Sequence, residues 1–137
     1  MTNQGIYDGA LRMIAETGES GRTDDYEERA PYLLSAFFNE NALTDRFYRQ
    51  FASLPAQGSY SAAFAELDEE YPFCDRTVYA AECYLAAMLI LDENPEISDK
   101  LYDRYACSMT AMREEIPGTE AAGAAYECGD IVDKYVY

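Results

Sequence analysis

The cysteines and the many carboxylates are the side chains of this 137-residue chain with the clearest chemical potential. The four cysteines are Cys74, Cys83, Cys107 and Cys128, and no two of them form a CxxC pair. Structural zinc sites draw on such pairs and on histidine, and the chain has no histidine. We therefore expect no metal site, and predict free, buried cysteines that act as small apolar side chains in a reducing compartment.

Recognisable catalytic motifs are missing from the sequence. Without histidine, the usual general base of hydrolases and the commonest metal ligand are both lacking. Neither a glycine-rich phosphate loop nor a dinucleotide fingerprint is present. Cys83 would lack a histidine partner, and burial in an apolar helix would raise the pKa of its thiol. The acidic run 66–70 lacks the alternating ligands and turn glycine of a calcium loop. We expect neither catalysis nor a cofactor.

The chain is strongly acidic, with 26 acidic and 10 basic residues and a formal net charge of -16. Such a chain is repelled by nucleic-acid phosphates and by anionic membrane surfaces. Specific DNA binding is therefore disfavoured, although a negatively charged wall would let DNA slide past without sticking. The N-terminus shows no signal peptide, and the longest apolar run, Val78–Leu91, is too short to span a bilayer. We expect a soluble protein made in a cytoplasm.

Apolar residues at helical spacing predict two N-terminal helices. The first covers Gln4–Glu16, with Asn3 as its cap, and the second begins at Asp24 or Asp25 and reaches about Phe51. The pattern of the second helix recurs at three- and four-residue intervals, at Ala30, Leu33, Leu34, Phe37, Asn41, Tyr48 and Phe51. Pro31 lies inside this pattern, and we expect it to kink the helix or to mark a true start near Ala30.

A helical hairpin is expected in the second half of the chain, after a long connection. The connection covers Leu54–Pro72, with a single helical turn within Ala62–Glu69. Asp75 caps a helix over Arg76–Leu91, and the turn 92–95 leads into a helix over Pro95–Glu115. The last helix is amphipathic, and its expected apolar face comprises Ile97, Leu101, Tyr102, Tyr105, Met109 and Met112, with Ser98, Asp99, Asp103 and Arg104 opposite.

The first helix of this hairpin is apolar on every side. Between Val78 and Leu91 only Glu82 carries a charge. A helix that is apolar all round must be buried all round, and three or four helices of this chain can barely surround it. We therefore expect it to be covered by copies of itself or by a partner, as in an assembly component.

The C-terminal part of the chain differs from the helical part. Pro117 and Gly118 end the helical region, and residues 119–129 are rich in alanine and glycine. The stretch Asp130–Tyr137 is β-prone and apolar, which predicts docking on its own domain or by strand addition to a neighbour. We expect one all-α domain over residues 1–137, with about four helices in 1–117 and an extended, β-prone docking tail in 118–137.

The candidate interaction residues come from this tail and from the last helix. They are Ile131, Val132, Tyr135 and Tyr137 in the tail, and Tyr102 and Tyr105 in the helix. For the two helical tyrosines, a role in the core of the same molecule is an equal alternative. Deletion of Asp130–Tyr137 should leave the helices intact and abolish assembly with a partner.

Several segments together resemble a known family. They comprise an N-terminal Ala-Leu in a short helix, Asp25–Leu34, Ala80–Leu91, Leu91–Glu96, Leu101–Tyr105 and Ile131–Tyr135. In this order they are similar to the head–tail connector, or adaptor, proteins of long-tailed bacteriophages and prophages. The strongest part is the apolar alanine-leucine helix, the Asp-Glu-Asn-Pro turn and the Tyr-x-x-Tyr helix. The insert 119–129 and the high tyrosine content depart from the family pattern.

The resemblance implies an all-α structural subunit that assembles into a homo-oligomeric ring beneath the phage portal protein. The ring would extend the DNA channel, with DNA passing through without specific binding, and would dock the next head-completion or tail protein. It implies no enzyme activity, cofactor or membrane partner. It also implies assembly in the bacterial host cytoplasm and then a place in the virion.

An alternative reading is an acidic helical interaction module, such as a DNA mimic or a regulator that sequesters a basic partner. A DNA mimic needs carboxylates in a dense pattern at phosphate spacing. Here they are spread over caps, loops and both helix faces, which counts against that alternative.

Overall fold

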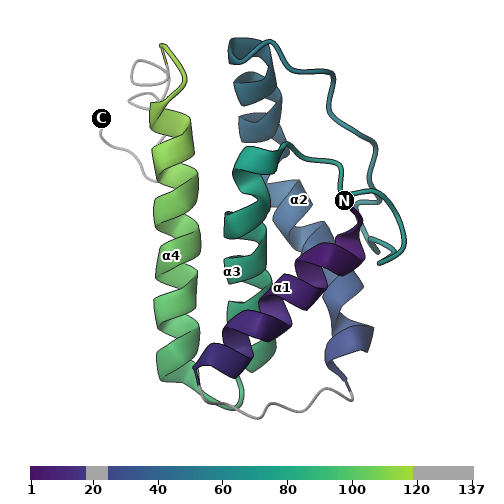
Figure 1. Ribbon diagram of the computed structural model, residues 1–137, viewed down its shortest axis with the longest axis vertical. Coiled ribbons are helices and arrows are strands. Elements are labelled where there is room, and N and C mark those ends of the chain that lie inside the picture. Colours follow the sequence, from purple (N-terminus) through teal and green to yellow (C-terminus); the bar gives the residue numbers. More distant parts are fainter. Residues whose placement is uncertain (18–24, 119–137) are drawn as a thin grey trace.

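The computed structural model describes residues 1–17 and 25–118, which contain four α-helices and a short 3-10 helix (Figure 1). The helices are α1 (Asn3–Glu16), α2 (Tyr26–Phe51), α3 (Val78–Ile90) and α4 (Pro95–Glu114), and η1 (Asp75–Thr77) precedes α3. No strand occurs in this described part of the chain, and the predicted all-α bundle of four helices is confirmed. The predicted docking tail lies outside the described residues.

Helix α3 lies at the centre of the bundle, with α1, α2 and α4 packed around it (Figure 1). Nine of its 13 residues are buried, and four of these are the alanines 80, 81, 86 and 87. Such small side chains let neighbouring helices approach closely. The expectation that α3 must be covered by other copies or a partner is therefore wrong, because the other three helices of the same chain cover it.

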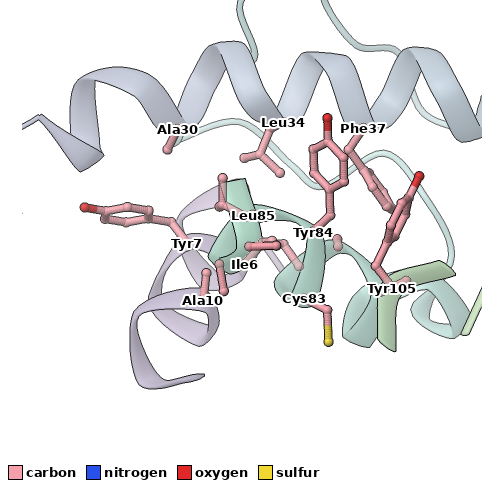
Figure 2. Packing of buried hydrophobic residues seen from close by; sticks show 14 of the residues in the cluster. Ile6, Tyr7, Ala10, Ala30, Leu34, Phe37, Cys83, Tyr84, Leu85 and Tyr105 are labelled. Carbon is pink, nitrogen blue, oxygen red and sulfur yellow. The ribbon is translucent and has the colours of Figure 1, made fainter. Parts of the chain in front are cut away.

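The core is made of side chains from all four helices that converge on α3 (Figure 2). Ile6 of α1, Leu34 of α2 and Leu85 of α3 are each fully buried. The approach of α1 to α3 is close at Gly9, where an added Cβ would lie 2.1 Å from Oε2 of Glu82. The missing Cβ of Gly9 leaves room for the Glu82 side chain to pack against α1. The one charged side chain of α3 therefore lies at the contact between α1 and α3.

Helix α1 begins one residue earlier than predicted, and Asn3 is not its cap. Thr2 occupies the cap position and makes no side-chain cap hydrogen bond. Asn3 is buried instead, and its side-chain amide donates to the carbonyl of Glu66 at 2.8 Å. The backbone N–H groups of Asn3 and Gln4 donate to the carbonyls of Glu69 and Leu67. The start of α1 is thus tied to the long connection rather than closed by a local cap.

Helix α2 runs through Pro31, so the predicted start near Ala30 is wrong. Proline has no N–H to donate to the carbonyl of Glu27, and this missing bond lies only in the second turn of a helix of 26 residues. Its own carbonyl accepts a hydrogen bond from the Ala65 N–H at 3.0 Å. Asp25 occupies the cap position without a side-chain cap bond, and pairs with Arg29 at 3.6 Å.

Residues 52–74 form an irregular connection, and the single turn predicted within Ala62–Glu69 is a hydrogen-bonded turn in which the Glu69 N–H donates to the Glu66 carbonyl at 3.3 Å. Polar side chains of α2 hold the connection in place. The Ser35 hydroxyl donates to the Ser61 carbonyl at 2.9 Å, and the Asn39 amide donates to the Ala62 carbonyl at 3.0 Å. These bonds explain why a long stretch without regular structure packs against the bundle.

The predicted α3–α4 hairpin is confirmed, with local differences. Asp75 begins η1 rather than capping α3, and α4 ends at Glu114. Pro95 occupies the first turn of α4, and the Asn94 side chain accepts a hydrogen bond from the Ile97 N–H at 3.1 Å. Ser98 was expected on the polar face, but it is buried against α3. Its hydroxyl is satisfied there, because it donates to the Ala87 carbonyl at 2.8 Å.

The described cysteines are free thiols. Cys74 and Cys83 are buried as predicted, whereas Cys107 is exposed on α4. Cys107 was expected to be buried, but it lies on the outer face of an amphipathic helix. Cys128 lies outside the described residues. Within residues 1–17 and 25–118, no helix is long and apolar enough to cross a membrane.

Candidate interaction surface

Tyr105, one of the two helical tyrosines singled out from the sequence, is a core residue. Its side chain is 6% exposed and lies against Phe37 and Tyr84 (Figure 2). Its hydroxyl donates to Oε1 of Glu40 at 2.6 Å and accepts a hydrogen bond from the Asn41 amide at 3.0 Å. Burial, and then the hydrogen bond to Glu40, raise the pKa of the phenol. Tyr105 therefore joins α4 to α2 within one molecule.

Tyr102 lies at the border between the core and the surface. Its ring centroid is 5.2 Å from that of Tyr105 and 6.3 Å from that of Tyr84. The side chain is nevertheless 38% exposed, so one edge of the ring faces away from the molecule. The prediction that Tyr102 belongs to the apolar face of α4 is thus correct in part, because its ring contacts Tyr84 and Tyr105 although the residue is 38% exposed. The outer edge leaves it available for a partner.

The remaining predicted interaction residues, Ile131, Val132, Tyr135 and Tyr137, lie outside the described residues. The structure therefore does not bring them together with Tyr102 or with any other candidate. Their role stays a prediction.

The C-terminal half of α2 carries an apolar surface that the sequence reasoning missed. Leu43, Phe47 and Phe51 follow one another at intervals of four residues, which places them on one side of the helix. Leu54, just beyond the helix end, extends the set, and the four side chains are between 42% and 48% exposed. We call these four residues the α2 stripe.

Phe51 belongs to the same helical pattern as Leu34 and Phe37, which are fully buried, yet it is 46% exposed. The buried face ends at Asp45, and beyond it the irregular connection covers only the side of α2 that carries Tyr48 and Arg49. The signal for the stripe was present as the four-residue spacing of 43, 47 and 51. Two apolar periodicities overlap on this helix, and the sequence alone does not say which of them faces the core.

An open cleft of about 400 Å³ adjoins the stripe at the end of the bundle. Its walls include Tyr48, Leu54 and Phe73, and the charged residues Arg49, Asp75 and Arg76 also line it. The rings of Tyr48 and Phe51 are in edge contact, with centroids 5.8 Å apart, and so connect the cleft to the stripe. The two features form one continuous, mainly apolar surface.

The end of α4 reaches the same place. Nη2 of Arg76 lies 2.7 Å from Oε2 of Glu115, the residue that follows α4. The hydrogen bond from Arg76 lowers the pKa of the Glu115 carboxyl. Burial, and then the charge of the nearby Glu115, raise the pKa of the Tyr48 phenol. The C-terminal end of α4 is thus fixed beside the cleft.

The chemistry that this surface offers is apolar contact rather than acid–base catalysis, because its two arginines are already paired with Asp45 and Glu115. The only thiol of the cleft, Cys74, is a poor nucleophile because burial raises its pKa to about 11. A second open cleft, of about 510 Å³, lies between residues 58–61 and 69–72 of the connection, with Glu69 and Glu70 on one side. Among the described side chains, no group of three or more His, Cys, Asp or Glu is placed to hold a metal ion.

Comparison of the chain with protein-family models, with curated proteins and with solved structures found no match.

Proposed function

We propose that this chain is a structural subunit of a long-tailed bacteriophage, a head–tail connector that assembles into a ring beneath the portal protein. The observation that carries an assembly role is the α2 stripe. Four large apolar side chains lie exposed in a row on a chain whose net charge is -16. Contiguous apolar surface of this kind is typical of protein–protein contact sites.

The sequence resemblance selects the connector among possible assemblies. The segments that carry it include the turn 92–95, which leads into α4, and Tyr102 and Tyr105 within α4. The acidic balance also supports the proposal, because a negatively charged channel wall repels the DNA backbone. DNA would then move along the ring without specific binding, while contacts to the portal and to the next head-completion or tail protein use apolar surface.

Because α3 is buried within one chain, its apolar surface is not evidence for assembly. The apolar central helix no longer calls for neighbouring copies. A ring would instead have to form through exposed side chains, and the α2 stripe is the largest row of them in the described residues.

The proposal is tested by the native mass of the purified protein, measured by light scattering over a concentration series, with electron micrographs of the largest species. Closed rings with a central hole would support a connector. If the protein is monomeric, its capture by the portal protein of the same phage becomes the deciding measurement. A compact dimer that does not bind the portal protein would overturn the proposal in favour of a regulatory interaction module.

Substitutions in the stripe separate its role from general stability. Phe47→Asp should abolish ring formation or portal capture, since it places a charge in the middle of the apolar row. Tyr32→Asp is the matched control, because Tyr32 is also an exposed aromatic residue of α2, at 61%, but lies about three turns before the stripe begins. Equal loss of assembly in both variants would contradict a specific role for the stripe.

A further inference from the structure

We propose that, in the unassembled chain, the α2 stripe is covered by the chain's own C-terminal segment, residues 131–137. This inference does not depend on the proposed function. It rests on three properties of the chain: the place where its described part ends after α4, the reach of the residues that follow, and the match between the segment and the stripe.

The first property is position. Gly118 is the last described residue, and it follows Glu115 by three positions. Glu115 is fixed by Arg76 and lies close to Tyr48, whose ring contacts Phe51 of the stripe. The chain therefore leaves the described bundle beside the end of α2 that carries the stripe.

The second property is reach. Ile131 lies 13 positions after Gly118, and a fully extended chain of that length spans at most about 45 Å. The helix rises about 1.5 Å per residue, so Leu43 and Phe51 are only about 12 Å apart along α2. A tethered segment within such reach has an effective concentration of roughly millimolar. In dilute solution this favours the chain's own segment over the same segment of another molecule.

The third property is composition. The segment carries Ile131, Val132, Tyr135, Val136 and Tyr137, which match the apolar character of the stripe. Acidic residues precede it at Glu127 and Asp130, and within it Asp133 is followed by Lys134. The stripe offers an exposed arginine, Arg46, between Leu43 and Phe47. The two carboxylates just before the apolar segment are therefore complementary in charge to Arg46, while the charges of Asp133 and Lys134 balance each other.

Site-specific photo-crosslinking in the full-length chain tests this proposal. The photoreactive residue p-benzoyl-phenylalanine replaces Phe47, and mass spectrometry maps the adducts after irradiation of dilute protein. We expect adducts with residues 131–137 in a species of monomer mass. The same residue in place of Tyr32, outside the stripe, should give no adduct with that segment.

A second variant keeps the test decisive. Ile131→Asp combined with Val132→Asp should reduce the adducts at position 47 at least about tenfold, because each lost apolar contact weakens binding by about that factor. Unchanged helical circular dichroism would show that the bundle is intact. Adducts outside residues 131–137 would overturn the proposal, as would adducts only at dimer mass that increase with concentration. The second result would assign the stripe to another copy and would leave the connector proposal standing.

Discussion

The side chain of Asp45 holds the backbone of Cys74, a residue 29 positions later in the chain. The Cys74 N–H donates to Oδ1 of Asp45 at 2.9 Å, while Arg49 and Gln57 each donate to Oδ2 at 2.9 Å. Asp45 is fully buried, on the core side of α2. One carboxylate thus joins α2, the beginning of the irregular connection and its end, and it closes the loop that forms the cleft beside the stripe.

Replacing Asp45 with alanine should therefore destabilise the protein strongly. Three donors would lose their acceptor, and Arg49, whose side chain is only 13% exposed, would keep an uncompensated charge. We expect the free energy of unfolding to fall by about 3 kcal/mol. Urea denaturation followed by circular dichroism measures it. Asp103→Ala, at an exposed position of α4, is the control and should change stability by less than about 0.5 kcal/mol.

The cysteines should differ sharply in their reactivity. Cys107 is exposed, while Cys74 and Cys83 are buried and the pKa of each thiol is raised by that burial, for Cys74 to about 11. At pH 8 only about one Cys74 in a thousand is a thiolate, the form that attacks a disulfide reagent. In a Cys107→Ser, Cys128→Ser variant, a chromogenic disulfide should react slowly with the folded protein and rapidly with two thiols in denaturant. Rapid reaction of the folded variant would contradict the burial of both residues.

The turn between α3 and α4 should depend on Asn94. Its side chain accepts the Ile97 N–H, one of the groups at the start of a helix that have no partner in the helix itself. Asn94→Ala should cost about 1 kcal/mol of stability, measured by thermal or urea unfolding. Asn94→Asp keeps an acceptor oxygen and should retain most of the stability. An equal loss in both variants would mean that the cap bond is not the reason for asparagine at this position.

Much of the bundle could be predicted from the sequence because helix boundaries depend on local signals. Pro95 and the turn before it fix the start of α4, and its predicted range agrees with the structure to within one residue. The same is true of α1. Such boundaries follow from backbone chemistry within one or two turns, which the sequence contains directly.

The connection and the surface were harder to predict because they depend on distant residues. Nothing local to Asp45 indicates that its partner is the N–H of Cys74. The coverage of α3 was underestimated, since the close approach of α1 at Gly9 appears only in three dimensions. For α2, Phe51 shares the helical spacing of core residues such as Phe37, and the sequence does not show that it lies on the surface. The predicted tail residues lie outside the described part of the chain.

The two tyrosines of α4 should separate core and surface roles. Tyr105→Phe removes the hydroxyl that Asn41 donates to and that donates to Glu40, and should cost about 1 kcal/mol of stability. Tyr102→Phe keeps the ring contacts of a half-exposed residue and should change stability by less than about 0.5 kcal/mol. Chemical denaturation of both variants measures the difference. A larger effect at Tyr102 would indicate that its hydroxyl has a structural role.

The charge of Glu82 should make stability depend on pH in a specific direction. Burial against α1 raises the pKa of this carboxyl, and the charge of Arg12 offsets the rise only in part. The folded state therefore binds the proton more tightly than the unfolded state, whose carboxyl has a pKa of about 4.3. The stabilising effect of protonation is present below the unfolded pKa and is lost as the pH rises through the folded pKa.

Glu82→Gln removes this charge, so the variant should be more stable than the parent at pH 7. The difference should shrink as the pH falls toward 4, and thermal unfolding at a series of pH values measures it. Glu115→Gln should behave in the opposite way, because the hydrogen bond from Arg76 lowers the pKa of Glu115. That variant should be less stable at pH 7, and the deficit should disappear as the pH falls through the lowered pKa. If both variants are more stable than the parent at pH 7, or both are less stable, the cause assigned to the pKa shift is wrong for at least one of these carboxyls.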